Sequence, residues 1–323
     1  MRRRAADYGT IMTEPIVPGT VLFGYEIGRV IGRGGMGTVY LARQLSLNRA
    51  VAVKVLHPQL LRNPAAVEDF LREARSSARL NHPHLVSTHD AHADPEKRLY
   101  CYSMEYVAGR SVTELMRSDG PLPRSLALHL AYQVASALGS AHQHDLVHRD
   151  VKPDNIMVTT SSNAKLLDLG LARDRLGGDT TTAGGHKLII IGTPEFSAPE
   201  QSRVPHLATA ASDVYSLGAT IFFMLTGYAP FRGETLIDMI VSASTDELDF
   251  PPSIPEDCHV LLSLMMARDP HDRLPHGAAV VSALETLAQG KVPSLPPSLH
   301  SSSELTAVSP LAKRRRRPMR RFR

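Results

Sequence analysis

One short segment constrains this chain more than any other: His-Arg-Asp-Val-Lys-Pro-Asp-Asn at positions 148–155. It places a candidate base, a cation and a metal ligand in one loop. Asp150 can accept the proton of an attacking hydroxyl group, Lys152 can lie against a phosphate, and Asn155 can hold Mg²⁺. Phosphoryl transfer requires these three parts, so we expect the rest of the fold to bring a nucleotide to this loop.

Length and composition allow a sizeable core. The 323 residues are 43% hydrophobic, which suits one two-lobed domain with tails. Cys101 and Cys258 lie far apart, which argues against a disulfide scaffold or a zinc site. No apolar stretch reaches the roughly 18 residues of a membrane span, and no signal peptide is evident. We therefore expect a soluble, cytoplasmic protein.

The basic charge of the chain belongs to its ends. Eleven of the 36 Lys and Arg residues lie in residues 2–4 and 313–323. The remaining 25 face 32 Asp and Glu residues, so the central part has a net charge of −7. No nucleic acid is therefore required as a partner, and any contact with nucleic acid or an anionic membrane would be a weak property of the C-terminal tail. A simply solvated tail is the favoured alternative.

Both ends of the chain have the composition of flexible segments. Residues 1–22 are polar, contain prolines and show no clear period, which predicts a flexible leader. Residues 289–323 are rich first in Pro and Ser and then in Arg, which predicts a disordered tail.

The predicted secondary structure changes from strands to helices along the chain. Alternating runs at 25–31, 38–43 and 50–56 predict antiparallel strands, and Asn63 followed by Pro64 predicts a helix start. Further apolar periods predict a strand over 99–104 and helices over 125–144, 212–226, 257–267 and 277–288. This order indicates an α+β fold, with a small antiparallel-sheet lobe carrying one main helix and a larger, mainly helical lobe.

A glycine-rich segment follows the first predicted strand. It reads Gly32, Arg33, Gly34, Gly35, Met36 and Gly37. Dinucleotide-binding folds use the same GxGxxG string, but there a helix begins at the glycines. Here strand-like residues follow, so the loop can fold over nucleotide phosphates, because the missing side chains let backbone N–H groups approach the oxygens. A plain glycine-rich turn is the alternative.

Lys54 ends the otherwise apolar segment Val-Ala-Val-Lys of a predicted strand. Burying its ammonium group without an anion would be costly. Nucleotide phosphates and Glu73, which lies near the buried face of the predicted helix, would supply negative charge. The simpler alternative is an edge-strand lysine with its ammonium group in water and a glutamate on the surface.

A second metal ligand is predicted at Asp168, in the sequence Asp-Leu-Gly. A short buried strand over 164–167 would deliver its carboxylate, and carboxylate oxygens suit Mg²⁺. Asp168 follows Asn155 by 13 positions, an interval over which a hairpin returns the chain to the same place. By itself the tripeptide indicates only a turn.

In order and spacing these motifs resemble the Ser/Thr protein kinases, especially the bacterial eukaryotic-like (Hanks-type) group. The resemblance implies a bilobal kinase domain over 25–288, with an N-lobe over 25–104 and a C-lobe over 108–288. The segment 192–200 resembles the end of a kinase activation segment, and Lys152 matches the Ser/Thr pattern rather than the Tyr pattern.

The resemblance also implies an ATP site between the lobes, with Met157 below the base and the backbone of Glu105 and Val107 as the hinge behind Met104. The implied ATP-binding residues are Ile31, Gly32, Arg33, Gly34, Gly35, Met36, Gly37, Thr38, Val39, Ala52, Lys54, Glu105, Val107 and Met157. The implied cofactors are ATP and Mg²⁺, with Mn²⁺ as an alternative ion.

Three further residues are implied to be structural. Glu200 is expected to pair with Arg273. Asp213 is expected to anchor the backbone of the catalytic loop, although a carboxylate at a helix N-terminus is the alternative.

Arg149 directly precedes Asp150, which in this family often accompanies control by phosphorylation of the activation segment. The candidate sites are Thr180, Thr181 and Thr182, with a plain polar loop as the alternative. The apolar stretch 187–191 could serve a partner or a homodimer.

The sequence thus predicts a non-specific Ser/Thr protein kinase. It would transfer the γ-phosphate of ATP to Ser and Thr hydroxyl groups of protein substrates, in signalling regulated by autophosphorylation. Asp150, Lys152, Lys54 and Glu73 would be the catalytic residues, with Asn155 and Asp168 as metal ligands. A non-catalytic pseudokinase usually lacks one of these groups, and a small-molecule phosphotransferase would not need the 192–200 platform.

Overall fold

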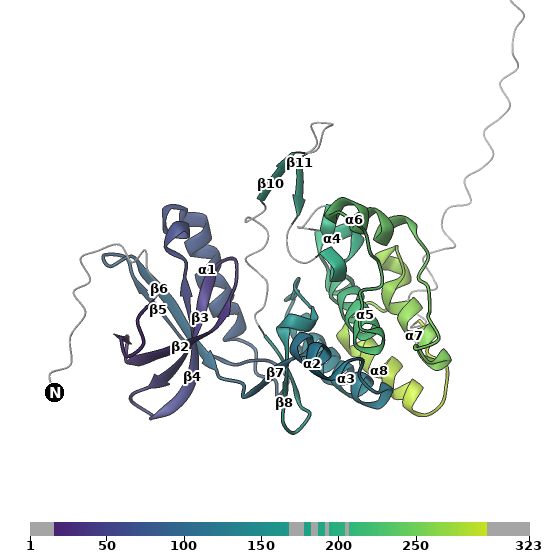
Figure 1. Ribbon diagram of the computed structural model, residues 1–323, viewed down its shortest axis with the longest axis horizontal. Helices are drawn as coiled ribbons and strands as arrows, with labels where there is room; N and C mark the ends of the chain where they lie inside the picture. Colours follow the sequence, from purple (N-terminus) through teal and green to yellow (C-terminus); the bar gives the residue numbers. More distant parts are fainter. Residues whose placement is uncertain (1–15, 168–177, 182–186, 191–193, 204–206, 296–323) are drawn as a thin grey trace, which may run out of the picture.

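The chain folds into two lobes of different architecture, a sheet-rich one and a helical one (Figure 1). The structure is a computed structural model that describes residues 16–167, 178–181, 187–190, 194–203 and 207–295. The predicted α+β, bilobal architecture is therefore confirmed. The described helices include none that is long and apolar enough to cross a bilayer.

The N-terminal lobe is built on an antiparallel sheet. Within the described residues its strand order is β1-β2-β3-β4-β6-β5. The strands are β1 (Val21–Leu22), β2 (Tyr25–Arg33), β3 (Gly37–Gln44), β4 (Arg49–Leu56), β5 (Thr88–Asp94) and β6 (Leu99–Glu105). The four predicted strands correspond to β2, β3, β4 and β6. The strands β1 and β5 were not predicted, because β1 has only two residues and β5 is polar and mostly exposed, so neither shows an apolar alternation.

Helix α1 (Pro64–Ser77) begins where the sequence predicts. The Asn63 side chain accepts a hydrogen bond from the Ala65 N–H at 3.1 Å, and Pro64 has no N–H that needs a partner. The buried face of the helix carries Phe70 and Ala74, which share an apolar cluster with residues of β4 and β6. The helix therefore lies against the sheet (Figure 1), and this brings Glu73 to Lys54 of β4.

The C-terminal lobe is mainly helical. Its described helices are α2 (Val112–Asp119), α3 (Arg124–His142), α4 (Pro199–Arg203), α5 (Ala210–Thr226), α6 (Leu236–Thr245), α7 (Glu256–Met266) and α8 (Gly277–Ala288). The four predicted helices correspond to α3, α5, α7 and α8. Helix α5 is buried along almost its whole length and forms the centre of the lobe.

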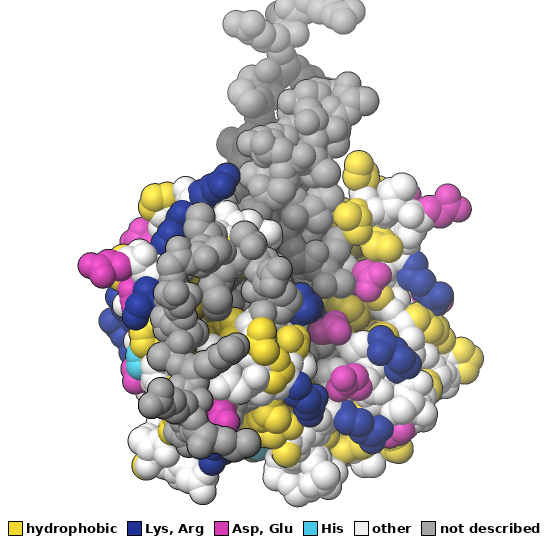
Figure 2. All heavy atoms as spheres, turned by 60° about the vertical axis from the view of Figure 1, so that its left-hand side comes forward, with side chains coloured by type: hydrophobic (Ala, Val, Ile, Leu, Met, Phe, Trp, Pro, Cys, Tyr) yellow, Lys and Arg dark blue, Asp and Glu magenta, His cyan; other side chains and the backbone are white. Residues whose placement is uncertain are grey.

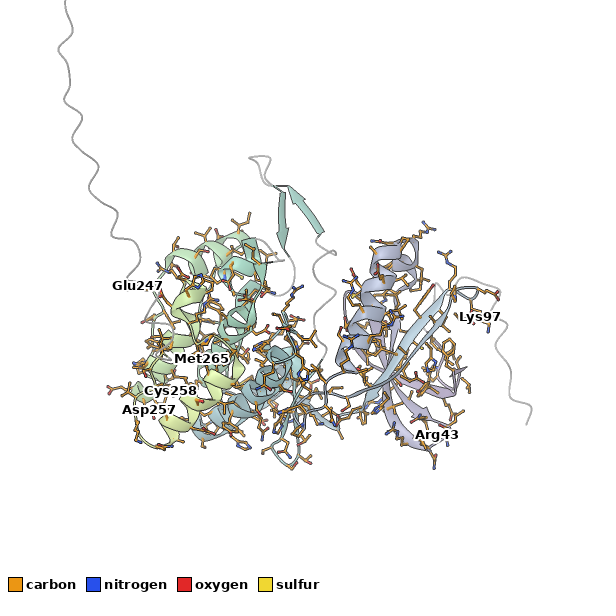
Figure 3. The ribbon with its side chains drawn as sticks, turned by 180° about the vertical axis from the view of Figure 1, so that it is seen from behind. Arg43, Lys97, Glu247, Asp257, Cys258 and Met265 are labelled. Atoms are coloured by element: carbon orange, nitrogen blue, oxygen red, sulfur yellow. The ribbon has the colours of Figure 1, made fainter. Side chains whose placement is uncertain are left out.

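Helices α3 and α8 approach closely at two glycines. A Cβ atom on Gly277 would lie 2.3 Å from the backbone nitrogen of Gly139, so a side chain cannot fit there. On α7, Cys258 and Met265 are buried in the core, and Figure 3 shows them in this lobe, with Arg43 and Lys97 across the molecule in the other lobe. Both cysteines are free and buried, as expected for a chain without a disulfide scaffold.

The remaining elements are short strands and 3₁₀ helices. The strands β7 (Gly109–Ser111), β8 (Ile156–Thr159) and β9 (Ala164–Leu166) pair in that order, and β10 (Gly178–Thr181) pairs with β11 (Lys187–Ile190). The 3₁₀ helices are η1 (Pro58–Arg62), η2 (Pro153–Asn155), η4 (Pro194–Phe196) and η6 (Pro270–Asp272). The predicted strand at 164–167 is present as β9, and the β10–β11 hairpin lies between the two lobes in Figure 1, with β11 in contact with α4.

The folded part extends beyond both predicted boundaries. Ile16 is buried in the core of the N-terminal lobe, and its N–H donates to the Tyr40 hydroxyl group at 3.3 Å. Residues 16–22, predicted as part of the flexible leader, instead pack on the sheet. Leu295 packs against the core of the other lobe, although it was assigned to the tail. Residues 1–15 and the basic tail lie outside the described residues.

Charged side chains of both signs are interspersed on the face of the molecule shown in Figure 2. On this face the described residues form no extended patch of one sign.

Candidate active site

Lys54 and Glu73 form a buried ion pair between the sheet and helix α1. The Lys54 Nζ and Glu73 Oε1 atoms are 2.7 Å apart, and the side chains are only 8% and 5% exposed. Burying two charges is tolerable only when they are paired with good geometry. The alternative of a lysine with its ammonium group in water and a surface glutamate is therefore wrong.

The glycine-rich segment forms the turn between β2 and β3. Gly32 pairs with Val39 across the two strands, and the Gly34 N–H donates to the Gly37 carbonyl oxygen at 2.9 Å. Because a strand follows the glycines, the loop does not have the strand-to-helix geometry of a dinucleotide-binding fold. The His57 Nε2 atom lies 2.8 Å from the Gly34 carbonyl oxygen, a link from the residue after β4 to the loop that the sequence did not reveal.

Apolar side chains predicted to enclose a base gather beside this loop. Ala52 and Met104 are buried in one cluster. The cluster's partly buried neighbours include Ile31, Val39, Val107 and Leu167. Leu167 was not predicted. Met157 lies on β8, in register with Lys165 of β9.

The three key residues of the loop at 148–155 meet at one carboxylate. The Lys152 Nζ atom lies 3.2 Å from Asp150 Oδ1. The Asn155 side-chain amide donates to the Asp150 backbone carbonyl at 2.8 Å and to Asp150 Oδ2 at 2.7 Å. Since the Asn155 nitrogen is occupied in this way, its side-chain oxygen faces elsewhere and can serve as a metal ligand.

Asp213 on α5 holds the backbone of this loop. Its carboxylate accepts hydrogen bonds from the N–H groups of His148 and Arg149, each at 2.7 Å. Arg149 has a φ of +66°, in the left-handed region that costs energy for residues other than glycine. His142 Nε2 lies 2.9 Å from Asp213 Oδ2. Asp213 thus anchors the loop, as the resemblance implied.

Glu200 and Arg273 form the other implied pair. Their two nitrogen–oxygen distances are 2.7 and 2.9 Å, and Arg273 is fully buried. Burial would raise the pKa of Glu200, but the hydrogen bonds and charge of Arg273 outweigh this effect and hold the pKa below its usual range. Gln201, the next residue, donates to the Arg149 carbonyl oxygen at 2.6 Å and so links this platform to the loop.

The remaining predicted site residues are Asp168 and three threonines of the activation segment. Asp168 and Thr182 lie outside the described residues. Thr180 and Thr181 belong to β10, where their backbones pair with Leu188 and Lys187. In the described ranges no three His, Cys, Asp or Glu side chains gather to hold a metal ion.

Sequence reasoning missed two polar contacts of the site. The Tyr102 hydroxyl group donates to Glu73 Oε1 at 2.7 Å. The Lys165 Nζ atom lies 2.8 Å from both carboxylate oxygens of Glu105. Alternation along 99–105 places Tyr102 on one face with Met104, but nothing in the sequence shows that β6 pairs with β4.

The sequence is similar to known proteins over most of its length. The protein kinase domain model matches residues 25–284. Serine/threonine-protein kinase PknB of Mycolicibacterium smegmatis is 36% identical over 291 residues, which cover 88% of this chain and 46% of that protein.

Two further relatives give similar values. PknA of Corynebacterium glutamicum is 33% identical over 290 residues, which cover 88% of this chain and 61% of that protein. PknB of Mycobacterium tuberculosis is 34% identical over 298 residues, which cover 89% of this chain and 46% of that protein. The chain thus spans about half to three fifths of the length of these relatives.

Proposed function

The chain belongs to the protein kinase family, and from this premise we propose that it is a bacterial Hanks-type Ser/Thr kinase that transfers the γ-phosphate of ATP to protein hydroxyl groups. The observation that carries this proposal is the convergence of Lys152 and Asn155 on the Asp150 carboxylate. Protein substrates, rather than small molecules, are proposed because the segment 192–200 resembles the end of a kinase activation segment, and the buried Glu200–Arg273 ion pair ties its last residue to the C-terminal lobe.

Four of the residues described above have a proposed role in this reaction. Asp150 orients the substrate hydroxyl group and receives its proton. Lys152 offsets negative charge on the transferred group. Lys54, held by Glu73, binds the phosphates of ATP beneath the glycine-rich loop. Catalysis then depends mainly on positioning and electrostatics, because the site brings fixed charges to the place where charge develops.

The donor set suits a divalent cation. Hard oxygen ligands are the ones that Mg²⁺ prefers, and the side-chain oxygen of Asn155 is left available because the amide nitrogen is bonded to Asp150. Asp168 would be the second ligand. When bound, Mg²⁺ or Mn²⁺ would neutralise charge on the phosphates of ATP.

Regulation is proposed to act through Arg149. A phosphate added by autophosphorylation to Thr180, Thr181 or Thr182 would pair with its guanidinium group and order the activation segment. Replacing all three threonines by alanine should then lower activity. We further propose a cytoplasmic signalling role and a homodimer contact through the apolar stretch 187–191.

Replacing Asp150 by alanine tests the proposed chemistry. The loss of a positioned base should lower kcat by about 10²–10⁴-fold and leave the Kd for ATP nearly unchanged. Phosphate incorporation from labelled ATP into a protein substrate measures the first quantity, and calorimetry the second.

Asp154→Ala is a matched control, because Asp154 lies in the same loop but is exposed. Turnover by Asp150→Ala at the wild-type rate would refute the assigned role. A wild-type protein that binds ATP without transferring phosphate would favour a pseudokinase, and labelling of aminoglycosides in place of proteins would favour a small-molecule phosphotransferase.

A further inference from the structure

A buried tyrosine joins the Lys54–Glu73 ion pair. Tyr102 is 2% exposed, and its hydroxyl group donates to Glu73 Oε1 at 2.7 Å. The Lys54 Nζ atom lies 2.7 Å from the same oxygen. One carboxylate oxygen of helix α1 is therefore held at once by a side chain of β4 and a side chain of β6.

The register of the sheet produces this arrangement. Lys54 and Tyr102 are directly opposite each other in the antiparallel β4–β6 pair, so both side chains leave the sheet on the same face. The Lys54 Nζ atom lies 5.5 Å from the centre of the Tyr102 ring. The same ring packs against Phe70 of α1, with 5.1 Å between the ring centres.

We propose that Tyr102 is a positioning residue, which holds Glu73 and, through it, Lys54 in the arrangement that binds the phosphates of ATP. This inference rests on the proposed function. If α1 moved away from the sheet, the hydroxyl group, the carboxylate and the ammonium group would have to separate within a buried region, which is costly. A hydrogen bond to a charged group contributes more than one between neutral groups. The Tyr102 hydroxyl group thus shifts the protein towards the state in which Lys54 and Glu73 are paired, which we call the engaged pair.

The effect on the enzyme follows from this population shift. When a smaller fraction of the protein has the engaged pair, the apparent affinity for ATP falls by the same factor. Saturating ATP restores the engaged state, so kcat changes little. Removing one hydrogen bond to a charged group is expected to shift the equilibrium by about tenfold, so KM and Kd for ATP should rise by up to that factor.

Tyr102→Phe removes the hydroxyl oxygen and keeps the ring that packs on Phe70. The expected result is an increase of about three- to tenfold in KM and Kd for ATP, with kcat within about twofold of the wild type. Tyr25→Phe is the matched control. Tyr25 of β2 is 3% exposed, and its hydroxyl group lies 2.9 Å from the Oγ atom of Ser103, the neighbour of Tyr102 on β6. Tyr25 itself belongs to the other core cluster of the lobe.

A double-mutant cycle with Glu73→Gln isolates the contact. In the Glu73→Gln background, Tyr102→Phe should change the Kd for ATP by less than about twofold, because the charged acceptor is already absent. The inference is overturned if Tyr102→Phe leaves KM and Kd unchanged, if Tyr25→Phe raises them equally, or if the effect persists in the Glu73→Gln background. Because Kd is measured without turnover, a wild-type protein that transfers no phosphate would contradict the proposed function and leave this test readable.

Discussion

Replacing Arg273 by leucine tests how far the C-terminal lobe depends on one buried guanidinium group. Arg273 is fully buried and donates to both carboxylate oxygens of Glu200. It also donates to the backbone carbonyl oxygens of Ala211, Ala267 and Arg268. No leucine atom can replace any of these donors, so all of these acceptors lose this partner in the variant.

The loss of folding free energy depends on how well water can solvate the Glu200 carboxylate once Arg273 is gone. The Glu200 side chain is 15% exposed, so water can compensate for the lost cation only in part. Removing one partner of a buried ion pair costs about 3–5 kcal/mol. That is a large share of the roughly 5–15 kcal/mol by which a typical domain is stable. For a domain of this size each kcal/mol lowers Tm by about 2–4 °C, so Tm should fall by roughly 6–20 °C.

Circular dichroism at 222 nm during heating and during urea titration measures this change. Arg124→Leu is the control, because Arg124 pairs with Asp257 on the surface, where both side chains are more than a third exposed. A solvent-exposed pair of this kind contributes about 0–1 kcal/mol. An Arg273→Leu variant that melts within about 2 °C of the wild type, or no lower than Arg124→Leu, would contradict the reasoning.

Two other outcomes are expected. The pKa of Glu200 is lower in the folded protein than in the unfolded chain. The stability that its ionised carboxylate contributes is therefore fully present above the unfolded pKa of about 4.3, and it is lost as the pH falls through the pKa of the folded protein. Glu200→Gln should therefore flatten the decline of Tm between about pH 5 and 3, and an unaltered pH profile would contradict this. Gly277→Val should lower the free energy of unfolding, measured by urea titration, by about 1–3 kcal/mol, because the new Cβ atom would lie 2.3 Å from the Gly139 nitrogen. An unchanged free energy of unfolding would show that α3 and α8 can move apart at this point.

Helices α2 and α6 carry local start signals in the sequence. Helix α2 begins with a capping box in which the Ser111 side chain accepts from the Glu114 N–H and Glu114 bonds back. Thr235 and Asp238 form the same arrangement at the start of α6. Ser/Thr followed three residues later by an acidic residue is a known start signal, so both helices carried a readable sign. Their apolar faces are short, and this is why periodicity did not reveal them.

The local features of this protein were readable in its sequence. The strands β2, β3, β4 and β6, the capped start of α1 and the grouping of Asp150, Lys152 and Asn155 depend on residues that are near one another along the chain. Backbone propensities, caps and turns act over a few residues, so a linear pattern is enough to predict them.

Only the tertiary structure decided which distant residues meet. The pairing of β4 with β6 sets Tyr102 opposite Lys54, and the packing of α1 brings Glu73 to both. The burial of Ile16 and the close approach of Gly277 to α3 arise in the same way. These contacts depend on strand register and on the fit of side chains between whole elements, and a one-residue shift in register would turn every side chain of a strand to the other face.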